Sequence, residues 1–111
     1  MVFEPNLIHA KVGDLVTFIP ADPGHNAESI SGMLPEGAEG FKGKVNEKIS
    51  YEVRGEGVYG VKCLPHYGMG MVALIVAGDP DNIESARAVR QMAGAKKTFD
   101  KLLAEAEAIK E

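Results

Sequence analysis

Residues 58–77 read VYGVKCLPHYGMGMVALIVA, in which two apolar runs flank the segment CLPHYGMGM at residues 63–71. The runs at residues 58–62 and 71–77 are rich in β-branched residues, so both are predicted strands. The flanked segment holds the only cysteine, one of three histidines and two of five methionines. A loop that turns back on itself can aim a thiolate, an imidazole and a thioether at one point, which a straight strand cannot do.

Four more short runs of β-branched and aromatic residues precede this segment, and glycine, proline and asparagine separate them. They are residues 2–4, 8–12, 15–19 and 49–53. Residues 21–46 contain too many glycines and prolines for one continuous element, so we expect loops there around a short segment near residues 25–30. Several strands at short spacing predict a mostly β protein with a sandwich or barrel.

After Gly78 the apolar pattern changes from a period of two to a period of 3.6, which predicts two helices. The first covers residues 80–92, with Asp79 as its N-cap and Pro80 at its first position. The second covers residues 95–109, and both are expected to pack on the sandwich. Their apolar faces are Ile83, Ala86 and Val89 in the first helix, and Phe99, Leu102, Leu103, Ala106 and Ile109 in the second. A helix lying on a membrane surface is the alternative for the second, although its polar face mixes acidic and basic residues.

A chain of 111 residues is long enough for one domain with a modest core and too short for two. We therefore expect a single domain over residues 1–111, made of a β-sandwich at residues 1–78 and a two-helix extension at residues 79–111. Hydrophobic residues make up 45% and charged residues 25%. No apolar stretch approaches the roughly 20 residues that a membrane-spanning helix needs, so no membrane insertion is expected.

The net charge of −4 argues against nucleic acid as a partner, since such domains usually carry clustered lysine and arginine. With a single cysteine, no internal disulfide can form. The first residues, MVFEPNLIHAKV, have neither a charged leader nor an apolar core before a small-residue cleavage site. No signal peptide is therefore expected in this sequence, which does not exclude export.

The spacing C-x2-H-x4-M links Cys63, His66 and Met71 and predicts three ligands of one metal ion. One more nitrogen ligand would complete the site, and the candidates are His9 and His25. His9 lies in a predicted strand, whereas His25 lies in the turn PGHN, where proline and glycine shape the backbone. His25 is the better candidate.

Two histidines, one cysteine and a distant methionine describe the trigonal site with a weak axial ligand that holds blue copper. A cysteine-nucleophile enzyme is one alternative, with Cys63 activated by His66 or His25, although no oxyanion site is evident. A copper store or chaperone uses the same ligand types. Structural zinc is the weakest alternative, because it prefers four cysteine or histidine ligands and rarely uses methionine.

The segments MVFEP, VTFIP, GHN, LPEGAEGFKGKVNE, GVYGVKC and PHYGMGMV closely resemble those of the pseudoazurins, a family of cupredoxin electron carriers of bacterial periplasms. The resemblance covers essentially the whole chain. It implies a Greek-key β-sandwich with two C-terminal helices, electron transport without substrate turnover, and a periplasmic location. It also implies an additional first strand before MVFEP, which this chain lacks and whose absence is expected to leave a neighbouring strand unpaired.

The same resemblance implies one type 1 copper ion, cycling between Cu(I) and Cu(II), with His25, Cys63, His66 and Met71 as its ligands. Met69 is then not a ligand. The family pattern further implies that the backbone N–H of Asn26 donates to the Cys63 sulfur. Pro65 has no N–H and so cannot add a second hydrogen bond of this kind.

For partners, the resemblance implies redox proteins such as copper nitrite reductase, or cytochromes, in denitrification. Electrons are expected to leave through the edge of the His66 ring, within a flat apolar surface. The residues expected around it are Pro65, Met69 and Met1, with Leu64 as a weaker candidate. The lysines expected to steer an acidic partner are Lys42, Lys44 and Lys62.

Overall fold

A computed structural model describes residues 3–91 and 93–109 of the chain. The strands are β1 (Leu7–Ala10), β2 (Leu15–Phe18), β3 (Glu28–Ser29), β4 (Ile49–Glu52), β5 (Gly57–Lys62) and β6 (Val72–Ala77). The helices are the 3₁₀ helix η1 (Leu64–Met69), α1 (Ile83–Arg87) and α2 (Ala93–Ile109). The predicted order, strands first and helices last, is confirmed.

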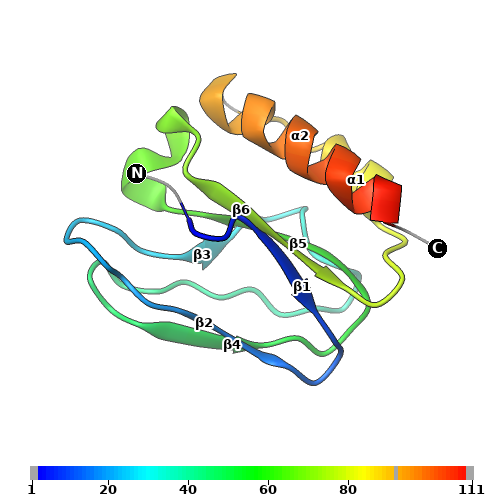
Figure 1. Cartoon of the computed structure of the whole chain (residues 1–111), viewed down its shortest axis with the longest axis horizontal. Coiled ribbons are helices and arrows are strands. Elements are labelled where there is room, and N and C mark those ends of the chain that lie inside the picture. The colour runs from blue at the N-terminus through cyan, green and yellow to red at the C-terminus, as the bar shows by residue number, and fades with distance from the viewer. Residues whose placement is uncertain (1–2, 92, 110–111) are drawn as a thin grey trace.

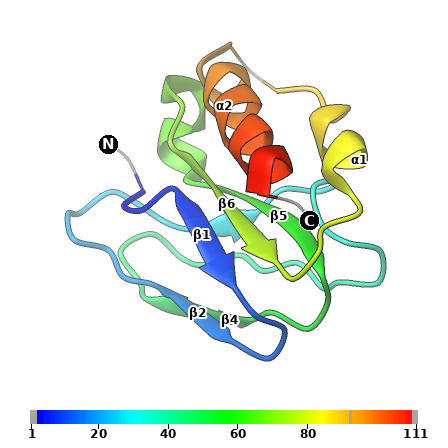
Figure 2. The same cartoon turned by 45° about the vertical axis from the view of Figure 1, so that its right-hand side comes forward.

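The strands form two sheets that lie face to face (Figure 1). One sheet has four strands in the order β1-β6-β5-β3, with β1 parallel to β6 and the other pairs antiparallel. The second sheet pairs β2 with β4 in antiparallel register, so that Val16 lies opposite Tyr51. Figure 2 shows α1 and α2 on the face of the four-stranded sheet that points away from β2 and β4.

Strand β6 lies at the centre of these three layers, and all of its residues are buried. Its side chains alternate between two cores. Val72, Leu74 and Val76 pack toward the helices, whereas Ala73, Ile75 and Ala77 pack toward the second sheet. Because both faces of the sheet are covered, β6 reads as a continuous apolar run and not as an alternating one.

The packing of the second helix on the sheet is confirmed. Four residues of the predicted apolar face of α2 are buried in the core with β6: Phe99, Leu102, Leu103 and Ala106. The side chain of Ile109 lies outside the described residues. Burying each large apolar side chain contributes about 1.5–3 kcal/mol, so this face anchors α2 to the sheet. None of the described helices is long and apolar enough to cross a bilayer.

The first predicted helix, residues 80–92, is wrong in its bounds, because α1 covers only Ile83–Arg87. Asn82, and not Asp79, precedes the helix, and its side chain makes no cap. Its amide instead binds both backbone groups of Val58, at 2.7 Å and 3.0 Å. Strand β3 is too short to reach Val58, so this side chain satisfies backbone groups that would otherwise be unpaired. The predicted apolar face is confirmed for Ile83 and Ala86, which are buried, whereas Val89 lies beyond the helix and packs half-buried against the same core.

The predicted strand at residues 2–4 is also not observed, because Phe3 and Glu4 are not in a strand; residue 2 lies outside the described residues. Phe3 instead packs its ring edge-on against Phe18, with ring centroids 5.7 Å apart. The predicted strand at residues 8–12 ends early, at Ala10. Lys11 and Asp14 close a tight turn there, in which the Lys11 N–H donates to Asp14 Oδ2 at 2.8 Å.

Candidate metal centre

The pairing of β5 with β6 brings Cys63 next to Met71. Lys62 lies opposite Val72, and one step further the Cys63 N–H donates to the Met71 carbonyl at 3.0 Å. The segment between them is η1, so the chain leaves one strand, makes a compact turn and enters the neighbouring strand. This arrangement confirms that residues 63–71 form a connection whose two ends lie side by side.

The shape of η1 decides where His66 points. The His66 N–H donates to the Cys63 carbonyl at 3.1 Å, and the His66 carbonyl accepts from the Met71 N–H at 3.3 Å. His66 itself has non-helical torsions, with φ −120° and ψ 18°. Gly70 ends the turn in the left-handed conformation, at φ 87°, which glycine adopts without strain. Two backbone bonds therefore tie His66 to both ends of the connection.

His25 comes from the connection between β2 and β3, and Asn46 holds it in place. The Asn46 N–H donates to the His25 carbonyl at 2.8 Å. The Asn46 side-chain oxygen accepts from the Gly24 N–H at 2.6 Å. Gly24 lies at φ 91°, so the PGHN turn depends on glycine at this position.

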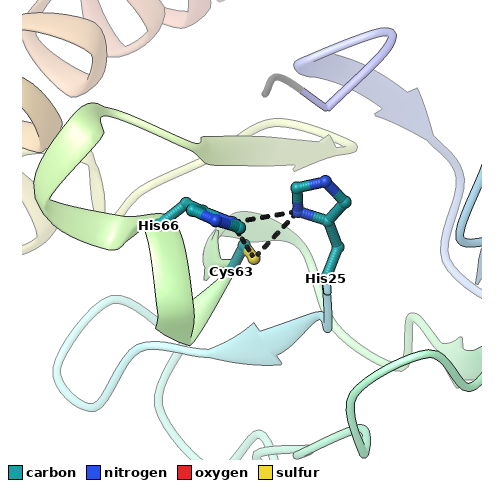
Figure 3. Close-up of side chains that lie close together, drawn as sticks. All are labelled: His25, Cys63 and His66. Carbon is teal, nitrogen blue, oxygen red and sulfur yellow. Dashed lines mark hydrogen bonds between the residues drawn. The ribbon is translucent and has the colours of Figure 1, made fainter. Parts of the chain in front are cut away.

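The two histidines and the cysteine converge on one point (Figure 3). Cys63 Sγ lies 3.6 Å from His25 Nδ1 and 3.7 Å from His66 Nδ1, and the two Nδ1 atoms are 3.0 Å apart. A triangle with these sides has a centre about 2.0 Å from each corner, which is the length of a metal–imidazole bond. The three donor atoms therefore fit one metal ion.

The environment suits a metal that changes its oxidation state. Cys63 is fully buried and Met71 is 5% exposed, whereas His25 and His66 are half-buried. Met71 lines the same groove as His25, so its thioether belongs to this end of the molecule. Two imidazoles, one thiolate and a neighbouring thioether are the donor set of a type 1 copper site. His9 is not part of it, because His9 pairs with Val76 in β1 and is exposed.

Asn26 follows His25 directly, and the hydrogen bonds seen at Asn26 are made by its side chain. Its Oδ1 accepts from the Leu64 N–H at 2.7 Å. Its Nδ2 donates to the Gly43 carbonyl at 3.0 Å and to Glu28 Oε1 at 3.1 Å. Asn26, directly after His25, thus holds Leu64, directly after Cys63.

Three of the residues expected at the docking surface are exposed residues of η1 itself. Met69 is 64% exposed, Leu64 is half exposed and Pro65 is exposed. Met1 lies outside the described residues. Among the lysines, Lys42 and Lys44 are exposed, and the ammonium of Lys62 lies 4.9 Å from the centre of the Tyr67 ring.

Three supporting residues were not singled out by the sequence. Asn46 braces His25, Glu28 binds Asn26, and Gln91 accepts a hydrogen bond from the hydroxyl of Tyr67. Asn46 has a positive φ of 69°, for which asparagine beside a punctuated loop is a weak signal. Glu28 and Gln91 carry no such signal, because polar residues in loops and short strands are typical of a solvated surface.

Comparison with known proteins gives consistent matches. A family model described as copper binding proteins of the plastocyanin/azurin family matches residues 1–78. The pseudoazurin of Paracoccus pantotrophus is 46% identical over 106 residues, which cover 95% of this chain and 73% of that protein. The pseudoazurin of Methylorubrum extorquens is 48% identical over 106 residues, which cover 95% of this chain and 72% of that protein.

Solved structures agree with these sequence matches. A pseudoazurin structure from Sinorhizobium meliloti aligns with a TM-score of 0.94 at 44% identity, covering 97% of this chain and 85% of that one. The predicted cupredoxin fold, mostly β with C-terminal helices, is thereby confirmed.

Proposed function

The chain belongs to the plastocyanin/azurin family of copper-binding proteins, and we propose that it delivers single electrons in a bacterial periplasm to a redox protein such as copper nitrite reductase or a cytochrome. Its relatives make it a blue copper electron carrier and not an enzyme. Its cofactor is one type 1 copper ion, which supplies a one-electron couple between Cu(I) and Cu(II) when bound. The role in denitrification is part of the proposal.

The observation that carries this function is the convergence of His25 Nδ1, His66 Nδ1 and Cys63 Sγ within 4.8 Å of one another. We assign these atoms as the three strong ligands and Met71 as the weak axial ligand. Thiolate and thioether favour Cu(I), and imidazole suits both oxidation states, so the donor set is a compromise between them. Backbone bonds of Met71 to Cys63 and His66 limit rearrangement of the ligand loop when the charge changes.

The burial of Cys63 argues against the nucleophilic alternative. A nucleophile must meet its substrate, but the thiol is fully buried between two imidazoles. The same burial disfavours a copper store or chaperone, since such sites are shallow and exchangeable. Reversible reduction and reoxidation without loss of copper is the result expected for a carrier.

We propose that electrons enter and leave at the edge of His66. The exposed side chains of Met69, Pro65 and Leu64 lie on the same connection and support an apolar docking surface there. Small interfaces of this kind suit redox encounters, in which the partners must separate quickly. The exposed Lys42 and Lys44, with Lys62 beside Tyr67, are proposed to steer acidic partners toward this end.

The Cys63 sulfur is proposed to accept one further hydrogen bond, from the backbone N–H of Asn26. Such a bond stabilises the thiolate and tunes the potential. Pro65 lacks an N–H and cannot donate a second one. The clamp between Asn26 and Leu64 supports the close approach that this bond requires.

A visible and electron paramagnetic resonance spectrum of the copper-loaded chain tests the proposal. We expect intense thiolate-to-copper charge transfer in the parent protein and its loss in Cys63→Ser. Rapid electron exchange with a copper nitrite reductase, slowed by added salt, supports the partner class. Intense absorption combined with no electron exchange at any ionic strength would contradict the proposed partner class but would still support the copper site.

A further inference from the structure

Glu28 is an acidic side chain buried at the copper end of the sandwich. It lies in β3, is only 9% exposed, and forms no ion pair among the described residues. Burying a carboxylate costs free energy unless hydrogen bonds compensate for the lost water. A residue held at such a cost points to a role beyond solubility.

The bond partner of this carboxylate is Asn26, which links two ligand-bearing segments. Glu28 Oε1 accepts from Asn26 Nδ2 at 3.1 Å, and the Gly43 carbonyl accepts from the same amide group at 3.0 Å. Both N–H donors of the amide are thereby used. The remaining oxygen, Oδ1, is left to accept the Leu64 N–H at 2.7 Å.

These three partners permit only one orientation of the Asn26 amide. If the amide turned over, its NH₂ group would face the Leu64 N–H and its oxygen would face the Glu28 carboxylate and the Gly43 carbonyl. Hydrogen bonds to a charged acceptor are roughly twice as strong as neutral ones, so Glu28 contributes most to this preference. Asn26 follows His25 and Leu64 follows Cys63, so the amide joins the two segments beside their ligands.

The charge of Glu28 is placed between two cations without being neutralised by direct contact. Lys62 lies directly opposite it in β5, and Lys42 lies opposite it on the other side through an isolated bridge. Directly opposite residues of antiparallel strands share one face of the sheet. Lys62 precedes Cys63, so the carboxylate lies one strand away from the cysteine ligand.

We infer that Glu28 is a positioning residue for the copper centre: its carboxylate holds the Asn26 amide that joins the Cys63 loop to the His25 turn, and its negative charge lowers the reduction potential. A negative charge favours the oxidised ion, which carries one more positive charge than the reduced ion. A buried charge is screened little by salt, so its effect persists at high ionic strength. The effect on potential rests on the proposed copper site, whereas the effect on the loop does not.

The test uses the full chain with Glu28→Gln and Glu28→Ala, and with Glu47→Gln as the control. Glu47 is exposed in the loop that follows Asn46, near His25. Glutamine removes the charge but keeps an acceptor for Asn26, and alanine removes both. Hydrogen exchange of the Leu64 amide, measured in the copper-free protein, reports on the clamp. The reduction potential of the copper-loaded protein, at low and high salt, reports on the charge.

In Glu28→Ala we expect the Leu64 amide to exchange about tenfold faster, because the Asn26 amide loses its strongest partner. In Glu28→Gln we expect a smaller increase in exchange than in Glu28→Ala, because a neutral acceptor remains, and a positive shift in potential, larger than that of Glu47→Gln and retained at high salt. Unchanged exchange in Glu28→Ala overturns the clamp. A shift in Glu28→Gln no larger than the control overturns the effect of charge. If copper did not bind, hydrogen exchange of the Leu64 amide would still decide whether Glu28 holds the Asn26 clamp.

Discussion

The Nδ1 atoms of His25 and His66 lie 3.0 Å apart, although 41 positions separate the two residues in the chain. They meet because the connection between β2 and β3 and the turn η1 lie at the same end of the two sheets. Cys63 Sγ completes the triangle at 3.6 Å and 3.7 Å. Two imidazole nitrogens and a cysteine sulfur at these distances can share a single metal ion.

The two methionines of the ligand loop are expected to behave differently. Met71 is 5% exposed beside the donor atoms, whereas Met69 is 64% exposed on η1. Met71→Leu should change the ratio of the charge-transfer bands and raise the potential, because the axial thioether is lost. Met69→Leu should keep both and alter only the rate of electron exchange with a partner. A normal spectrum in Met71→Leu would refute the axial assignment.

Gly94 allows the start of α2 to touch the ligand loop. A Cβ at Gly94 would lie 2.7 Å from the Gly68 carbonyl oxygen and 3.0 Å from the Gly70 nitrogen, and both are backbone atoms. A glycine-to-alanine substitution inside a helix normally stabilises it by about 0.5–1 kcal/mol. Here we expect a loss of about 1–3 kcal/mol from overpacking, measured by denaturant unfolding, and an altered copper spectrum, because the loop before Met71 must shift.

The control for this prediction is Leu102→Ala in the same helix. Leu102 is buried against the sheet, so its truncation should cost about 2–5 kcal/mol. Its copper spectrum should nevertheless match that of the parent protein. A Gly94→Ala protein that is more stable than the parent, with an unchanged spectrum, would show that the contact has no influence on the site.

Lysines near the copper end should influence the rate of partner association. Lys44→Gln should lower the rate constant with an acidic redox partner about twofold at low ionic strength, and the difference should vanish at high salt. Lys11→Gln is the matched control, because Lys11 follows β1 at the opposite end of the sandwich. Stopped-flow kinetics can compare the two. Equal effects from both substitutions would indicate a net-charge effect and no local steering.

Tyr59 should make the fold sensitive to alkaline pH. Burial raises the pKa of Tyr59, and the hydrogen bond that its hydroxyl accepts from the Gly55 N–H acts in the opposite direction without cancelling that rise. Since the folded pKa lies above the unfolded value of roughly 10, the stability contribution is complete below that pH. It is lost as the pH rises through the folded pKa.

Tyr59→Phe tests this by removing the titrating group. We expect the variant to be less stable at neutral pH by about 1–2 kcal/mol, because it loses the two hydrogen bonds between the hydroxyl and the Gly55 backbone. Its free energy of unfolding should then fall less steeply than that of the parent above pH 10 or so. Parallel pH profiles for the two proteins would contradict the prediction.

Local patterns predicted the long elements better than the short ones. Strand β6 and helix α2 follow from apolar runs that burial enforces along their whole length. Helix α1 begins later than its pattern predicts, because the Asn82 side chain binds the edge of β5. Strand β3 is only two residues long and is defined by its pairing with β5. Partners distant in sequence decide such elements, so local propensity cannot predict them.

The sequence by itself determined the chemical types of the donors and the connection that carries three of them, because Cys63, His66 and Met71 lie within nine residues between two strong strand signals. The tertiary structure decided how His25 reaches them and what holds the site. Asn46 braces the His25 turn, and Asn26 joins that turn to the Cys63 loop. The reason is physical: residue type and short spacing constrain local geometry. The side-chain bonds that set donor distances to within a few tenths of an ångström arise only when distant segments pack together.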